Sequence, residues 1–147
     1  MPSVVVRPAA AKDFEVVTEL LAELGRPHVP DDSVDVARWV YERHLKKPEC
    51  GSLVAEHDGN VVGFLSLEFR ERLNRARPQA WIPDLIVTES ARGTGIGKAL
   101  LVRALADARD RGCWSVTLES GRSRHVAHEL YRSLGMVDEG DYFILYY

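Results

Sequence analysis

The spacing of apolar residues over the first third of the chain is mainly helical. An apolar run at residues 4–6 predicts a short strand, which a proline ends. Asp13 is placed to begin a helix that a glycine ends, and its apolar face consists of Phe14, Val17, Leu20, Leu21 and Leu24. Asp31 or Asp32 begins a second helix that ends before Pro48, and its apolar face consists of Val34, Ala37, Val40, Tyr41 and Leu45. The pattern therefore predicts one strand followed by two amphipathic helices.

Strand-like segments replace the helical spacing in the middle of the chain. Residues 52–57 and 60–69 are rich in β-forming side chains, and Asp58-Gly59 between them is a strong signal for a hairpin. Residues 81–88 are almost wholly apolar apart from Asp84, which is typical of a central strand that is covered on both faces. Three strands are therefore expected over this stretch.

The last third of the chain alternates between helical and strand-like spacing. One helix ends at Gly112 and carries an apolar stripe of Leu100, Leu101, Ala104, Leu105 and Ala108. Residues 113–119 predict a strand, a further helix ends at Gly135, and a hairpin at Gly140 leads to a last strand through Tyr147. Hairpins need antiparallel neighbours, whereas the strand, helix and strand over residues 81–119 need a parallel pair. The sequence thus predicts an α/β fold with a mixed sheet, about seven strands and about four helices.

Composition and charge favour one ordinary globular domain over residues 1–147. A chain of 147 residues has the commonest length for a single core. The net charge is only −3 and basic residues are interspersed with acidic ones, so nucleic acid is not an expected partner. No run reaches the roughly 18 apolar residues of a membrane span, which leads us to expect a cytoplasmic protein without a membrane partner. Cys50 and Cys113 lack the spacing of metal ligands, and His125 and His128 lack a third ligand nearby, so no metal is expected.

The segment with the clearest chemistry joins the apolar strand at residues 81–88 to the following helix. Gly93, Gly95 and Gly97 leave a run of backbone N–H groups unobstructed by Cβ atoms, at the positive end of the helix dipole. Arg92 adds a permanently charged donor. Lys98 stands in the first helical turn, where the positive charge of a lysine opposes the helix dipole. A lysine at this position makes sense if a phosphate is bound nearby. The segment therefore predicts an anion-binding turn.

Spacing separates three known kinds of phosphate-binding turn. A P-loop needs a glycine five positions before Gly97 and a Ser or Thr after Lys98, but the chain has Arg92 and Ala99 there. A dinucleotide-binding turn needs a third glycine where Lys98 stands. The pattern Arg-x-x-Gly-x-Gly, formed by Arg92, Gly95 and Gly97, instead resembles the pyrophosphate-binding turn of the GNAT superfamily of acyl-CoA-dependent N-acyltransferases.

Two flanking segments strengthen this resemblance. Upstream, Leu85, Ile86 and Val87 resemble the central strand of the family. Downstream, a second segment resembles the family pattern Ala-x-x-x-Tyr-x-x-Leu-Gly-Phe with a methionine in place of the phenylalanine, and it consists of Ala127, Tyr131, Leu134, Gly135 and Met136. The resemblance implies a GNAT-like fold, in which the central strand and residues 113–119 form a splayed parallel pair.

The resemblance also implies that acetyl-coenzyme A is the acyl donor. Backbone groups of Leu85 and Val87, on either side of Ile86, would hydrogen-bond the pantetheine arm as a neighbouring strand does. A backbone N–H of the same strand, that of Val87, would hold the carbonyl oxygen as it gains charge. The diphosphate would rest on the turn, whose binding residues are Arg92, Gly93, Thr94, Gly95, Ile96, Gly97 and Lys98.

Tyr131 is the residue that the resemblance assigns as the acid that protonates the departing sulfur. A packed tyrosine with its hydroxyl at the surface is the alternative. For the base, Asp84 is the lone carboxylate of an apolar strand, or else a hydrogen-bonded carboxylate that orients the preceding loop. Glu68 on the neighbouring strand is the second candidate for the base, and a chain of waters is the third.

The sequence leaves the acceptor open. The first prediction is a primary amine of a small molecule, which attacks acetyl-coenzyme A directly in a ternary complex. A peptide N-terminus, a lysine or a polyamine are the alternatives, and a sensor that binds acyl-coenzyme A without catalysis is a hypothesis from another class. The apolar residues 142–147 provide a strand either for the sheet of the same chain or for pairing in a homodimer.

Overall fold

The computed structural model describes residues 3–147, which divide into two compact units. One unit ends at Thr117, and the other runs from Leu118 to Tyr147. Among the described residues, none of the helices has the length and apolar character needed to span a bilayer. The single domain that the sequence favours over residues 1–147 stays a prediction.

Seven strands and four α-helices are present in the described part of the chain, which are the numbers that the sequence predicts, although the strands are not all in the predicted places. The strands are β1 (Val4–Pro8), β2 (Leu53–His57), β3 (Asn60–Leu65), β4 (Glu68–Arg70), β5 (Gln79–Ile82), β6 (Leu85–Val87) and β7 (Ser115–Leu118). The α-helices are α1 (Phe14–Glu23), α2 (Val34–Lys46), α3 (Ile96–Asp110) and α4 (His125–Ser133). Short 3-10 helices are η1 (Ala11–Asp13), η2 (Asp31–Ser33) and η3 (Glu89–Ala91).

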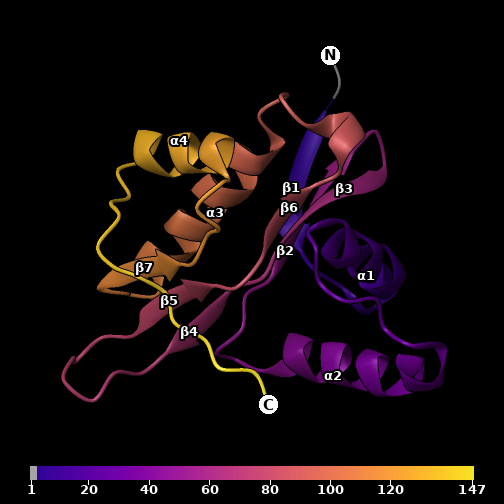
Figure 1. Cartoon of the computed structure of the whole chain (residues 1–147), viewed down its shortest axis with the longest axis horizontal. Coiled ribbons are helices and arrows are strands. Elements are labelled where there is room, and N and C mark those ends of the chain that lie inside the picture. Colours follow the sequence, from indigo (N-terminus) through magenta and orange to yellow (C-terminus); the bar gives the residue numbers. More distant parts are fainter. Residues whose placement is uncertain (1–2) are drawn as a thin grey trace. The chain divides into compact units, whose positions relative to one another are not determined.

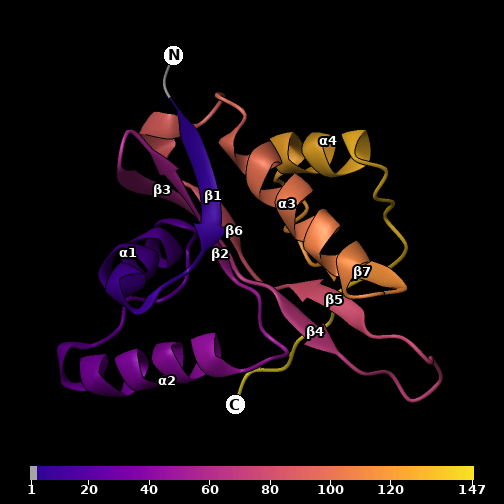
Figure 2. The same cartoon turned by 180° about the vertical axis from the view of Figure 1, so that it is seen from behind.

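The strands form two sheets (Figures 1 and 2). The larger sheet has the order β1-β2-β3-β6 with antiparallel neighbours throughout, and the smaller has the order β4-β5-β7. Helix α1 lies against one face of the larger sheet and α3 lies against the other. The hairpin predicted at Asp58-Gly59 is confirmed, since it joins β2 to β3 and both residues have positive φ, 51° and 82°.

Helix α3 packs closely against the larger sheet. On the opposite face, α1 contributes to a buried cluster that consists of Val17, Leu20, Val54, Phe64 and Ile86. On the α3 face, a Cβ atom at Gly63 would come within 2.9 Å of Leu100 Cδ1 and 3.4 Å of Ile96 Cγ2. The missing side chain at Gly63 therefore lets the first turns of α3 approach β3 closely.

Two of the predicted long strands are interrupted, which corrects the predicted topology. Residues 60–69 divide into β3 and β4, and residues 81–88 divide between β5 and β6 at Pro83 and Asp84. Pro83 has no N–H to donate to a ladder, and Ser66 Oγ donates to Asp84 Oδ2 at 2.7 Å across the break. Each segment therefore gives one part to each sheet. As a result β5 neighbours β7 in the smaller sheet while β6 belongs to the larger, which is the divergence expected of the splayed pair.

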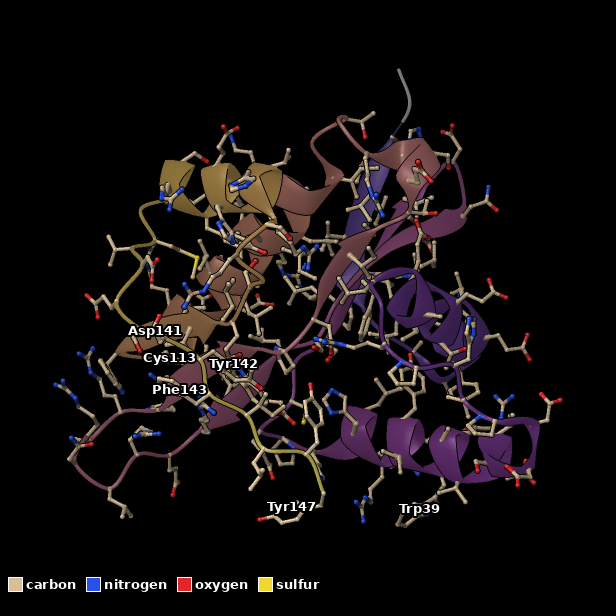
Figure 3. All side chains as sticks on the ribbon, viewed as in Figure 1. Trp39, Cys113, Asp141, Tyr142, Phe143 and Tyr147 are labelled. Atoms are coloured by element: carbon tan, nitrogen blue, oxygen red, sulfur yellow. The ribbon has the colours of Figure 1, made fainter. Side chains whose placement is uncertain are left out.

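The predicted C-terminal hairpin and strand are wrong. After α4, residues 134–147 contain no helix or strand. Figure 3 shows Tyr142, Phe143 and Tyr147 along this segment, and their side chains are exposed. A strand requires a neighbour that completes its backbone hydrogen bonds, whereas apolar β-forming residues supply only the propensity.

Asp13 stands at the start of α1, but its carboxylate binds Arg7 rather than capping the helix. Two guanidinium nitrogens of Arg7 donate to it at 2.7 and 2.9 Å, and the N–H of Ala10 donates at 2.8 Å. Arg7 also donates to Glu56 on β2. Asp13 is only 3% exposed, and the Arg7 guanidinium lowers the pKa of its carboxyl group. The carboxylate thus links β1 to the turn that precedes α1.

Replacement Asp13→Asn is expected to lower the free energy of unfolding by about 2 kcal/mol at pH 7, because charge-assisted hydrogen bonds to Arg7 are lost. Since the pKa of Asp13 is lower in the folded state, its contribution is present above the ordinary carboxyl pKa and is lost as the pH falls through the folded value. Urea unfolding at pH 7 and below about pH 4 measures the change. The exposed Asp35→Asn is the control, and an equal effect of Asp13→Asn at both pH values would contradict this role.

Candidate functional site

The loop between β6 and α3 has the backbone conformation of an anion-binding turn. Gly93 and Gly95 have φ values of 78° and 85°, a region that residues with a Cβ atom rarely adopt. Between them, Thr94 Oγ1 donates to the carbonyl of Ala91 at 2.6 Å, which braces the turn. Helix α3 then begins at Ile96, whose side chain is 1% exposed and holds the turn against the core.

Backbone N–H groups at the start of α3 are available to a ligand. The first hydrogen bond of the helix runs from Ala99 N to Gly95 O at 3.0 Å. The N–H groups of Ile96, Gly97 and Lys98 therefore precede it and have no partner within the helix. The Lys98 side chain is exposed in the same turn. These donors, together with the helix dipole and one ammonium group, can hold an anion.

Strand β6 has one open edge next to this turn. The carbonyl of Asp84 accepts from Ser66 N, directly after β3, at 3.0 Å, and Thr88 N donates to the carbonyl of Val62 on β3 at 2.8 Å. Ile86 faces the same way in the antiparallel ladder. The N–H and C=O groups of Leu85 and Val87 therefore point to the opposite edge. Among residues 3–147, no strand pairs with that edge. Of the three predicted binding residues in β6, Leu85 and Val87 present backbone groups there, whereas Ile86 does not.

Arg92 is held by a group that the sequence did not reveal. Its Nε donates to the carbonyl of Val87 at 2.9 Å, and another guanidinium nitrogen pairs with Glu23 at the end of α1 at 3.2 Å. Glu23 also accepts from the N–H of Glu89 at 2.7 Å and from Thr88 Oγ1 at 3.0 Å. Glu23 thus caps η3 and positions Arg92, so the turn is tied to α1.

Replacement Glu23→Ala is expected to lower the free energy of unfolding by about 1–2 kcal/mol, because the N–H of Glu89 and the guanidinium of Arg92 lose a common acceptor. Urea unfolding measures the change. Glu19→Ala, an exposed glutamate one turn earlier on α1, is the matched control. If both variants lost the same stability, the effect would belong to the helix and not to the contacts of Glu23.

Asp84 lies at the break between β5 and β6 with both carboxylate oxygens hydrogen-bonded. Arg26 Nε donates to Oδ1 at 3.0 Å, and Ser66 Oγ donates to Oδ2 at 2.7 Å. Arg26 also donates to the carbonyl of Pro83 at 3.0 Å. The side chain of Asp84 is 17% exposed. These contacts tie Asp84 to the loop after α1, whereas the predicted structural role is to orient the loop that precedes Asp84, and its role as a base stays a prediction.

Glu68, the other predicted carboxylate, is the first residue of β4 and lies close to Cys50 and to His44, a residue that the sequence did not single out. Its carboxylate, a ring nitrogen of His44 and Sγ of Cys50 all lie within 4.8 Å of one another. His44 Nε2 is hydrogen-bonded to Ser52 Oγ at 2.7 Å. Burial lowers the pKa of His44, which favours the neutral ring, and burial raises the pKa of the Cys50 thiol. Glu68 is 18 positions from Cys50 and 24 from His44, so no local pattern could have brought it to the other two.

Tyr131 lies on α4, in the second unit, and its phenol is partly buried. Burial raises the pKa of Tyr131, partly offset by the charge of Arg124 and a hydrogen bond with Ser120. Ser120 also bonds His128 Nε2 at 3.1 Å, and the rings of His128 and Tyr131 lie 6.3 Å apart. The phenol therefore keeps its proton at neutral pH, as an acid must.

Three comparisons with known proteins agree with these features. The family model described as the acetyltransferase (GNAT) family matches residues 14–136. An uncharacterised N-acetyltransferase of Methanocaldococcus jannaschii is 35% identical over 104 residues, which make up 70% of this chain and 46% of that protein. An aminoalkylphosphonate N-acetyltransferase of Salmonella typhimurium is 30% identical over 131 residues, 89% of this chain and 83% of that protein. The crystal structure of a Trypanosoma brucei acetyltransferase has a TM-score of 0.83 at 27% identity, covering 99% of this chain and 100% of its own.

The divided sheet, the open edge of β6 and the glycine turn before α3 define the fold of an acyltransferase. The chain belongs to the acetyltransferase (GNAT) family, so the resemblance found in its motifs is confirmed. The match spans 46% of the length of the Methanocaldococcus protein and 83% of the Salmonella protein.

Proposed function

We propose that the protein transfers an acetyl group from acetyl-coenzyme A to a primary amine of a small molecule, in a ternary complex. The observation that carries this proposal is the turn with two left-handed glycines directly after a strand with an open edge. The N–H groups from Gly93 to Lys98 would bind the diphosphate, and the half-exposed Arg92 would add positive charge. The backbone of Leu85 and the carbonyl of Val87, which also accepts from Arg92, would hydrogen-bond the pantetheine arm as an added strand does.

The proposed transfer is a direct attack on the thioester. After the ammonium has given a proton to the base, the neutral amine nitrogen bonds to the carbonyl carbon. The tetrahedral intermediate collapses when the carbon–sulfur bond breaks, and the proton that the nitrogen then loses replaces the one that the acid gives to sulfur. The N–H of Val87 would hold the oxygen while it carries negative charge. Tyr131 would give its phenol proton to the departing sulfur, an assignment that rests on the motif it shares with the family. The raised pKa of Tyr131 supports this role, because the phenol is protonated when the thiolate leaves.

For the base, we propose Glu68 in preference to Asp84. Arg26 and Ser66 already bind both oxygens of Asp84. If Asp84 took a proton from a substrate ammonium, its carboxylate would lose its charge and the ion pair with Arg26 would weaken. Glu68 lies at the edge of the smaller sheet with its side chain partly exposed. A chain of waters remains the alternative to either carboxylate.

A small amine is the proposed acceptor. The Salmonella typhimurium relative is named for aminoalkylphosphonates, which are small primary amines, and this chain covers most of its length. Acetylation of a peptide N-terminus or a lysine is the second candidate, and an acyl-coenzyme A sensor without turnover is the third. The same turn would bind the coenzyme in all three cases.

Release of the thiol from acetyl-coenzyme A over a panel of amines tests the proposal. The panel contains aminoalkylphosphonates, aminoglycosides, polyamines and peptides with free N-termini. Release that depends on at least one small amine is the expected result. Release with peptides alone would favour the second candidate, and coenzyme binding without amine-dependent release would favour the sensor.

A further inference from the structure

Three different metal-binding side chains converge where the end of α2, the segment before β2 and the start of β4 meet. His44 comes from the last turn of α2, Cys50 from the segment before β2, and Glu68 from the first position of β4. One ligand atom from each lies within 4.8 Å of the other two, and all three residues are half-buried. The group does not include the turn before α3, but it shares Glu68 with the proposed acyl transfer, so this carboxylate can act as the base only in the metal-free protein.

Backbone pairing places Cys50 directly opposite Glu68. The two residues form an isolated antiparallel bridge. Two backbone hydrogen bonds flank it at 2.8 and 2.7 Å, Gly51 N to Leu67 O and Phe69 N to Glu49 O. This pattern makes Cys50 and Glu68 a non-hydrogen-bonded pair, in which the Cα atoms are closest and both side chains project from the same face. Their juxtaposition is therefore set by the backbone and not by a chance rotamer.

His44 is held beside this pair by a buried serine. Ser52 is 6% exposed, and its Oγ accepts a hydrogen bond from the N–H of Leu67 at 3.2 Å. The same Oγ bonds His44 Nε2 at 2.7 Å. A hydrogen bond to one ring nitrogen fixes the orientation of the imidazole, as it does for histidines that bind metals.

We infer that His44, Cys50 and Glu68 form a binding site for one zinc ion. Zinc takes thiolate, imidazole and carboxylate ligands at about 2.0–2.3 Å in tetrahedral geometry, which places the donors roughly 3.3–3.8 Å from one another. The three ligand atoms lie within 4.8 Å of one another, so small side-chain rotations would bring them to these distances. The thiolate and the carboxylate together neutralise the ion, and a thiolate disfavours magnesium and calcium. The thiol proton leaves when the metal binds, and a water molecule fills the fourth position.

Titration of the metal-free full chain with Co²⁺, a spectroscopic substitute for zinc, tests this site. One equivalent is expected to produce the thiolate-to-cobalt charge-transfer absorption and the visible bands of a tetrahedral ion, and Zn²⁺ should displace it. Cys50→Ala should abolish the charge-transfer absorption. Loss of a direct ligand exceeds the 10- to 100-fold effect of an outer partner, so His44→Ala should weaken Zn²⁺ binding in calorimetry by at least about 100-fold.

Cys113→Ala is the matched control, because Cys113 is also a partly exposed free thiol but lies outside the cluster. Its Co²⁺ spectrum and Zn²⁺ affinity should equal those of the wild type. Circular dichroism of each metal-free variant checks the fold, and Cys50→Ser replaces Cys50→Ala if the latter unfolds. The inference is overturned if the wild type gives no charge-transfer absorption, if the absorption survives in the Cys50 variant, or if it disappears in Cys113→Ala.

Discussion

Replacement Gly95→Asp is expected to weaken the binding of acetyl-coenzyme A by about 100-fold or more. The new carboxylate would stand at the N-cap of α3, where an aspartate accepts hydrogen bonds from the first N–H groups of the helix. It would compete for the donors that we propose for the diphosphate and would also repel that group. Two unit charges about 5 Å apart, at an effective dielectric constant of 20, interact by about 3 kcal/mol. Because 1.4 kcal/mol corresponds to a factor of ten, calorimetric titration should resolve the loss easily.

Gly59→Asp is the matched control for this substitution. Gly59 and Gly95 have nearly the same φ, 82° and 85°, and a Cβ atom would meet nothing within 4 Å at either position. Both variants therefore have similar backbone strain and the same new charge, but only Gly95→Asp places them in the turn before α3. The control should bind acetyl-coenzyme A like the wild type, and equal losses in the two variants would refute the role of the turn.

Replacement Tyr131→Phe is expected to lower kcat by roughly ten- to a thousand-fold and to leave the Kd of acetyl-coenzyme A unchanged. The phenol acts in this proposal only when the carbon–sulfur bond breaks, so its loss should affect turnover and not binding. A thiolate is a fairly stable leaving group, which explains why some activity should remain. Steady-state kinetics with an active amine, together with calorimetry, separates the two effects.

The pH dependence gives a second measure of Tyr131. Burial raises the pKa of this phenol above its ordinary value of about 10, and the protonated form is the active one. Activity due to the phenol should therefore be retained up to pH 10 and fall only above it, and this alkaline fall should be missing in Tyr131→Phe. Tyr142→Phe, an exposed tyrosine of the same unit, is the control and should behave like the wild type. Unchanged turnover in Tyr131→Phe would remove the residue from the mechanism.

The parts of the protein that were predictable from sequence depend on residues close together in the chain. The turn before α3 is one example, because Gly93 and Gly95 supply backbone conformations that other residues rarely adopt. The hairpin at Asp58-Gly59 is another, and the apolar spacing predicted all four helices. The fold class followed from the order of these elements and from the resemblance to the family.

The parts that were not predictable depend on contacts between distant positions. Arg26 and Asp84 are 58 positions apart, and Glu23 and Arg92 are 69 apart, so neither pair leaves a signal in the local pattern. Of the two roles that the sequence left open for Asp84, a base or a structural carboxylate, the first contact favours the structural one. The break at residues 83–84 was visible as a proline, but the apolar run around it indicated one continuous strand. The strand predicted for residues 142–147 is absent, because strand propensity alone does not provide a neighbouring strand.

Hydrogen exchange of the backbone amides at the start of α3 tests most directly whether they bind the diphosphate of acetyl-coenzyme A. We expect the amides of residues 93–98 to exchange more slowly when acetyl-coenzyme A is added, while the hairpin amides at residues 58–59 stay unchanged. Binding of the coenzyme without slower exchange at residues 93–98, or no binding at all, would contradict the proposed site.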